Sequence, residues 1–106
     1  MGKYAFLITG GPDRVGSVLN AIEYALRLDE AGHEIVIYLD GAATEWPAES
    51  GRRSGHPFVE SFTESCGRGL VVGACAFYAT ACGATYGCRK ADIDLLGPPA
   101  EQHGPD

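Results

Sequence analysis

Cys75 is the residue of this sequence with the clearest potential for chemistry, because it lies between an apolar run and a segment of small residues. The run at residues 69–74 predicts a buried strand, and the segment at residues 76–84 predicts a helix. Free backbone N–H groups and the helix dipole in a first helical turn favour a thiolate over a thiol. The spacing therefore predicts a reactive sulfur at the carboxyl end of a strand, suited to sulfur or redox chemistry.

The other three cysteines are weaker candidates for chemistry. Cys82 follows Cys75 by two helical turns, about 10 Å, which is too far for a disulfide within one helix, so we predict a small buried core residue and not a resolving thiol. Cys66 precedes the strand and is expected at the opposite edge of the sheet, in a structural role. Cys88 follows the helix and could approach Cys82. Their spacing does not match a zinc site, so we expect no metal.

Two further loops are predicted to meet Cys75 at the same edge of the sheet. They follow the apolar runs at residues 4–8 and 33–39, and the carboxyl ends of parallel strands share one edge, where ligands bind near a switch in strand order. The first loop is rich in glycine before a helix but matches neither a P-loop nor a dinucleotide fingerprint, so a plain tight turn is the favoured interpretation and no cofactor is expected. The candidate substrate-binding residues at this edge are Gly10, Gly11, Asp13, Arg14, Asp40 and Trp46.

The polar segment at residues 42–55 contains Trp46 and is predicted to be a lid-like loop over the sulfur. His56 borders this segment and is the histidine that the sequence brings nearest to Cys75. A Cys-His hydrolase would need such a base, but no spacing supports that partnership. The tail at residues 97–106, rich in Pro, Gly and charge, is predicted to be unstructured.

The alternation of strand and helix signals predicts one α/β domain at residues 1–96. A helix is expected from Ser17, a plausible N-cap, to Gly32, and its wide apolar stripe, which includes Tyr24, indicates either a well-covered core helix or a contact with another subunit. A weaker helix is expected at residues 56–66 and an edge strand at residues 91–96. We predict a small open, mostly parallel sheet with helices on both faces, in a flavodoxin-like layering. So few strands imply that an αβ element is absent or that another protomer covers an edge.

Composition excludes several classes of function. The 106-residue chain has a net charge of −6, and its longest basic cluster is an Arg-Arg pair, so a nucleic-acid surface is not expected. No apolar stretch reaches the roughly 20 residues of a membrane span, and the N-terminus does not read as a signal peptide. We therefore expect a cytoplasmic protein without a membrane partner, whose cysteines are mostly reduced.

Three stretches resemble the DsrE/DsrF-like (TusD-like) sulfur-relay family: Tyr-Ala-Phe-Leu-Ile-Thr-Gly from Tyr4, Ala-Gly-His-Glu-Ile-Val-Ile-Tyr-Leu-Asp-Gly from Ala31, and Leu-Val-Val-Gly-Ala-Cys ending at Cys75. The resemblance implies a small α/β fold that assembles as a homotrimer or homohexamer. It also implies that Cys75 is the residue that carries a persulfide. Its partners would be a protein persulfide donor and a thiol acceptor, and its activity that of a sulfurtransferase.

Two alternatives remain open at this point. The chain would be a non-catalytic structural subunit or small-molecule-binding module if Cys75 were a buried, inert residue. It would be a thiol redox sensor if Cys75 formed a sulfenic acid and then a disulfide. Thiol reactivity separates the first alternative from sulfur transfer, and a defined disulfide after mild peroxide separates the second.

Overall fold

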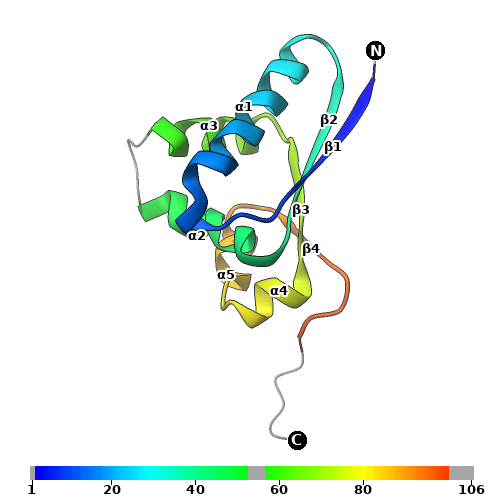
Figure 1. Ribbon diagram of the computed structural model, residues 1–106. Coiled ribbons are helices and arrows are strands. Elements are labelled where there is room, and N and C mark those ends of the chain that lie inside the picture. The colour runs from blue at the N-terminus through cyan, green and yellow to red at the C-terminus, as the bar shows by residue number, and fades with distance from the viewer. Residues whose placement is uncertain (1, 53–56, 101–106) are drawn as a thin grey trace, which may run out of the picture.

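The computed structural model describes residues 2–52 and 57–100, which form a sheet and a layer of helices (Figure 1). The strands are β1 (Lys3–Ile8), β2 (Glu34–Leu39), β3 (Val71–Cys75) and β4 (Asp94–Leu96). The helices are α1 (Val15–Glu30), α2 (Trp46–Arg52), α3 (Pro57–Gly67), α4 (Ala76–Ala81) and α5 (Thr85–Lys90). Two 3-10 segments, η1 (Pro12–Arg14) and η2 (Gly41–Glu45), lead into α1 and α2.

The four strands are all parallel and lie in the order β1-β2-β3-β4. Ile8 lies beside Leu39, and Leu39 beside Ala74, so the first three strands end at one edge of the sheet. The small open parallel α/β sheet is therefore confirmed. The edge strand expected at residues 91–96 is β4, shorter than predicted, and it pairs with β3.

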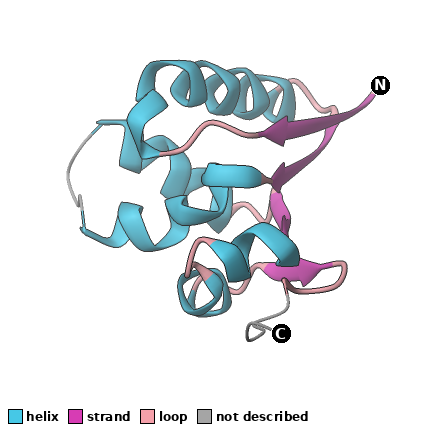
Figure 2. Ribbon diagram, turned by 60° about the horizontal axis from the view of Figure 1, so that its bottom comes forward, coloured by secondary structure: helices cyan, strands magenta, loops and turns pink. Residues whose placement is uncertain are grey.

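The helices lie on one side of this sheet, so the expectation of helices on both faces is wrong (Figure 2). Right-handed crossovers between strands that are neighbours in both sequence and space put every connecting helix on the same side. Burial follows this arrangement along β2, where Ile35 and Ile37 are buried while Val36 and Tyr38 are only partly buried. We call the side without helices the open face; register and side-chain alternation assign to it Lys3, Ala5, Leu7, Glu34, Val36, Tyr38, Gly73, Cys75, Asp94 and Leu96.

An aromatic cluster of Trp46, Phe58 and Phe62 lies at the centre of the hydrophobic core, on the helix-covered side. The ring centroids of Trp46 and Phe58 are 4.2 Å apart, and all three side chains are buried. The lid-like loop predicted at residues 42–55 is therefore wrong. The segment is helical in η2 and α2 because burial of the indole fixes it to the core. Its last residues, 53–55, lie outside the described residues.

The long helix α1 starts earlier than predicted and stops where predicted. We expected Ser17 as the N-cap, but η1 runs directly into α1, and Arg14 takes the N-cap position without a side-chain hydrogen bond. Gly32 has a φ of +94°, the left-handed conformation that ends a helix. Tyr24 is exposed, so its part of the apolar stripe does not belong to the core. The helix expected at residues 56–66 is α3.

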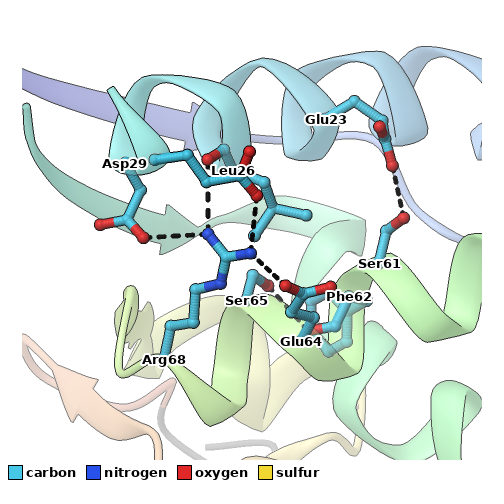
Figure 3. Close-up of polar contacts among 9 residues, drawn as sticks. Glu23, Leu26, Asp29, Ser61, Phe62, Glu64, Ser65 and Arg68 are labelled. Atoms are coloured by element: carbon cyan, nitrogen blue, oxygen red, sulfur yellow. Dashed lines mark hydrogen bonds and ion pairs between the residues drawn. The ribbon is translucent and has the colours of Figure 1, made fainter. Parts of the chain in front are cut away.

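Arg68 links the carboxyl ends of α1 and α3 through a network of ion pairs (Figure 3). Its guanidinium nitrogens lie 2.8 Å from Glu30 Oε2 and 3.0 Å from Asp29 Oδ2, and one of them also contacts Glu64. Hydrogen bonds to Glu30, Glu64 and Asp29 raise the pKa of Arg68 above its usual value. This network links the carboxyl end of α1 to the carboxyl end of α3.

Candidate functional site

Cys75 is the last residue of β3 and occupies the N-cap position of α4. Its backbone is extended, with φ −66° and ψ 118°, and its side chain makes no capping hydrogen bond. The thiol is free and partly exposed. The sheet therefore presents this sulfur at its carboxyl edge, as the strand and helix signals predicted.

The helix after Cys75 is shorter than expected, which changes the setting of Cys82. Gly83 ends the helix, with a φ of +67°, and α4 has only six residues. Cys82 is the C-cap residue and is exposed, so the prediction of a buried core residue is wrong. The buried side of α4 carries alanines, and the helix ends before Cys82 could turn inward. A six-residue helix also has a smaller dipole than the longer helix that was predicted.

The remaining cysteines are held in the folded core. Cys66 lies in α3 and borders a hollow at the amino ends of β3 and β4, at the opposite edge of the sheet from Cys75. Burial raises the pKa of its thiol to about 11. Cys88 is buried, its Sγ lies 3.5 Å from the carbonyl oxygen of Thr44, and burial raises its pKa as well. All four cysteines are free thiols. The Cys88 thiol contacts the carbonyl oxygen of Thr44, so the predicted approach to Cys82 gives no disulfide.

The glycine loop is packed against its neighbour and forms the tight turn favoured above. Trp46 donates a hydrogen bond from Nε1 to the carbonyl oxygen of Gly10 at 2.8 Å. A Cβ on Gly11 would lie 2.7 Å from the Cβ of Ala42, so glycine is needed for this close approach. The loop continues as η1, in which Asp13 and Arg14 are exposed. These contacts account for the glycines without an anion.

Asp40 and Trp46, the other candidate binding residues, have structural tasks. Asp40 follows Leu39, whose partner in β3 is Ala74, so Asp40 lies at the same edge as Cys75. Its Oδ1 accepts a hydrogen bond from the backbone N–H of Gly41 at 2.8 Å, which caps η2. Trp46 lies in the core and does not cover the sulfur. His56 lies outside the described residues.

The strand order also changes what the carboxyl edge can do. A ligand crevice in an open α/β sheet forms where the strand order reverses, and this order does not reverse. A hollow of about 550 Å³ lies instead between α2 and α5, lined by residues that include Pro47, Arg52, Tyr86 and Lys90. Cys75 is not among its lining residues, so the structure does not join the sulfur to this hollow.

Exposed apolar side chains next to Cys75 were not recognised in the sequence. Phe77 and Tyr78 of α4 are about half exposed, with ring centroids 5.5 Å apart. Leu96 of β4 is the register partner of Cys75 and is 43% exposed. The apolar character of these residues was the only sequence signal for an exposed hydrophobic surface. A buried helix and an edge strand would have the same apolar residues, so the signal did not distinguish these cases. The sulfur thus lies beside a hydrophobic surface and not inside a polar pocket.

Two searches of the described part of the chain concern other kinds of site. Within residues 2–52 and 57–100, no three or more His, Cys, Asp or Glu side chains are grouped so that they could hold a metal ion. Over the same ranges, every helix is too short or too polar to cross a membrane. Comparison with protein-family models, curated proteins and solved structures finds no match. The resemblance to DsrE/DsrF-like proteins therefore stays a prediction.

Proposed function

We propose that this protein is a cytoplasmic sulfur-relay protein that accepts sulfane sulfur as a persulfide on Cys75 and passes it to an acceptor thiol. The observation that carries the proposal is the position of Cys75 at the carboxyl end of β3, partly exposed and without a hydrogen bond that engages its side chain as a cap. Cys66 lies at the opposite edge of the sheet and Cys88 is buried, and burial raises the pKa of both thiols. A nucleophilic sulfur needs access to its partner and a thiolate form.

Transfer requires two exchange reactions at this sulfur. In the first, the Cys75 thiolate attacks the outer sulfur of a donor protein persulfide, R–S–SH. A new S–S bond forms on Cys75, the donor S–S bond breaks, and the donor leaves as the thiolate R–S⁻. In the second, an acceptor thiolate attacks the outer sulfur of Cys75–S–SH, which returns Cys75 to its thiolate. Each step exchanges one S–S bond for another, so no external oxidant or reductant is consumed.

The exposed apolar surface beside the sulfur supports a protein partner over a small polar substrate. Phe77, Tyr78 and Leu96 offer partly exposed hydrophobic area next to Cys75. Apolar and aromatic side chains are the groups that anchor protein–protein contacts. A homotrimer or homohexamer, with a persulfide donor and a thiol acceptor as visiting proteins, belongs to the same proposal.

Mass spectrometry after incubation with a persulfide donor tests this function. We expect an adduct of about 32 Da, the mass of one sulfur atom, in the peptide that contains Cys75. Cys75→Ser should abolish the adduct, whereas the exposed Cys82 provides a matched control, since Cys82→Ser should leave it intact. An adduct that survives Cys75→Ser, or that maps to Cys82, would contradict the assignment.

A further inference from the structure

The outer edge of β1 has no partner strand within the described residues, because the strand order β1-β2-β3-β4 places β1 at one end of the sheet. The backbone N–H of Asp40, just past β2, donates to the carbonyl oxygen of Ile8, so the even-numbered residues of β1 direct their peptide groups to β2. The peptide groups that point outward are those of the odd-numbered residues Lys3, Ala5 and Leu7. A strand that pairs there would form a second hydrogen-bonded ladder.

This edge lacks the features that keep edge strands from pairing. Natural proteins protect such edges with charged side chains, proline or β-bulges. The strand β1 has no proline, its register with β2 is unbroken, and its charged residue, Lys3, stands at its first position. Tyr4 is 42% exposed and Leu7 is 64% exposed. The edge is therefore six residues long, mostly apolar and open to another strand.

One flank of α1 carries apolar side chains on the same side of the molecule as this edge. We define the flank as Ala21, Tyr24 and Leu28, which recur at three and four residues along the helix. The other side of α1 faces α3, where Glu23 accepts a hydrogen bond from Ser61. Ala21 lies about 200° around the helix from Glu23, so the flank points away from α3 and towards the side of β1. Tyr24 is 65% exposed there.

We propose that β1 pairs in antiparallel orientation with β1 of a second copy of this chain, about a two-fold axis perpendicular to the sheet. The two sheets then form one continuous sheet, and this axis keeps the helices of both copies on the same face. In a register centred on Phe6, apolar side chains meet only apolar side chains: Phe6 faces Phe6, Ala5 faces Leu7, and Tyr4 faces Ile8. The hydrogen-bonded pairs are those of Ala5 with Leu7, since these peptide groups point outward.

The position of α1 favours a second copy over an extended peptide as the occupant of this edge. The helix α1 connects β1 to β2 and packs on both strands. An axis midway between strands about 4.8 Å apart places the two α1 helices about 10 Å from each other across the joined edge, which matches the 8–10 Å of packed helices. A peptide strand would pair with β1 but would leave the flank of α1 exposed. A second copy supplies a strand and a helix together.

This contact leaves the sulfur accessible. Cys75 ends β3, and Leu96 belongs to β4 at the opposite edge of the sheet, so neither residue lies at the joined edge. Sulfur transfer at Cys75 and the β1 dimer are therefore independent of each other. A two-fold contact of this kind is compatible with a dimer or a hexamer but cannot generate a trimer alone.

The size of the edge predicts a weak dimer. A strand of six residues is about 20 Å long, and the strip from the open-face side chains to the flank of α1 is roughly as high. Two such strips bury on the order of 800 Å² in total, below the roughly 1,200–2,000 Å² of stable complexes. We therefore expect a monomer–dimer equilibrium in the range of about 10 µM to 1 mM.

Analytical ultracentrifugation of the full chain across that concentration range tests the proposal. The wild-type mass should rise from one chain towards two. Leu7→Lys should keep the protein monomeric, because a lysine protects an edge strand from pairing. Tyr24→Asp should weaken dimerisation at least about ten-fold, because its carboxylate would lie between the two α1 helices. Two matched controls should dimerise like the wild type: Tyr86→Asp, at an exposed tyrosine of α5, and Leu96→Lys, on the other edge strand β4.

Amide hydrogen exchange of the wild type, followed by NMR at both ends of the concentration range, tests the edge directly. The backbone N–H groups of Ala5 and Leu7 should exchange several-fold more slowly at the high concentration, because the dimer engages them in hydrogen bonds. Phe6 is the control within the same strand, since its N–H points to β2 in the monomer and in the dimer alike. This measurement needs no variant, and it separates pairing at the edge from any other contact between copies.

Circular dichroism and urea midpoints at low protein concentration check that the variants fold. A wild type that stays monomeric up to about 1 mM overturns the proposal. So does amide exchange at Ala5 and Leu7 that is the same at both concentrations, or a dimer of wild-type strength in Leu7→Lys or Tyr24→Asp. A dimer that is lost in Leu96→Lys overturns it as well, because the contact would then involve the opposite edge of the sheet.

Discussion

Along β2, Ile35, Ile37 and Leu39 are buried under helices, whereas Val36 and Tyr38, which alternate with them, lie on a face that no described helix covers. Both sets are apolar, so composition does not distinguish them. The difference arises from the strand order, which puts the helices on one side. An apolar strand therefore predicts that both faces of the sheet are packed against other groups. It does not predict which part of the molecule packs there.

Truncation of a core residue should give the largest difference between the two faces. Phe62→Ala removes a buried ring from the aromatic cluster, so we expect a loss of about 3–5 kcal/mol in the free energy of unfolding. Leu7→Ala on the open face should change that free energy by no more than about 0.5 kcal/mol at low protein concentration. Urea unfolding measures both values. Similar losses in the two variants would contradict the assignment of the faces.

A substitution at Gly73 tests how closely the open face itself is packed. A Cβ there would collide with Leu96 Cδ1 and lie 3.4 Å from Tyr38 Cδ1. Gly73→Ala should therefore displace Leu96 and weaken the pairing of β4, at a cost of about 1–2 kcal/mol by urea unfolding. Adding Leu96→Ala should recover most of that loss. If the double variant is less stable than Gly73→Ala alone, the clash is not the cause.

Alkaline pH should weaken the fold through its buried thiols. Burial raises the pKa of Cys66 from 9.0 to about 11, so between these values the unfolded chain releases this proton and the folded chain keeps it. The contribution is fully present below pH 9 and is lost as pH rises to about 11, a loss of about 1–2 kcal/mol. We expect Cys66→Ala to lose less stability than the wild type between pH 8 and about pH 10.5, as measured by urea midpoints.

The exposed Cys82 supplies the control for this measurement. Cys82→Ala should follow the pH dependence of the wild type, because that thiol is not buried. An identical alkaline loss in Cys66→Ala and in the wild type would show that Cys66 does not keep its proton in the fold.

The smallest effect on stability is expected from the loss of the ion pairs that Arg68 makes. Arg68→Met removes two ion pairs to α1 and one to Glu64 of α3, but the groups are partly exposed, so the decrease in thermal midpoint should be modest. Because salt screens such pairs, the difference from the wild type should shrink in about 1 M NaCl. Arg27→Met, which changes an exposed arginine of α1, is the control. A decrease that is unchanged by salt would assign the role of Arg68 to packing.

Local signals predicted much of the fold. The apolar runs marked three strands, Gly32 ended the first long helix as expected, and Cys75 lies where a strand passes into a helix. Residues 42–52 were misjudged because Trp46-Pro47 and the surrounding small and polar residues carry no helical period. Their helical structure depends on burial of the indole against Phe58, a contact that only the tertiary structure creates.

The candidate site was predicted in part. The position of Cys75 follows from the order of the run and the helix, which are both local. The roles of Trp46 and Asp40 were not predictable in the same way, because either side chain could serve a ligand or the protein itself. The hydrogen bonds to Gly10 and from Gly41 assign both side chains to the protein.

By itself, the sequence determined that parallel strands alternate with helices and that a cysteine ends the third strand, since run length and spacing act over a few residues. Only the tertiary structure decided that the strands follow one another in space and that the helices gather on one face. Strand order depends on how distant segments pack together, and no local pattern records it. The apolar side chains of the open face could be recognised in the sequence. That no described helix packs against them could not.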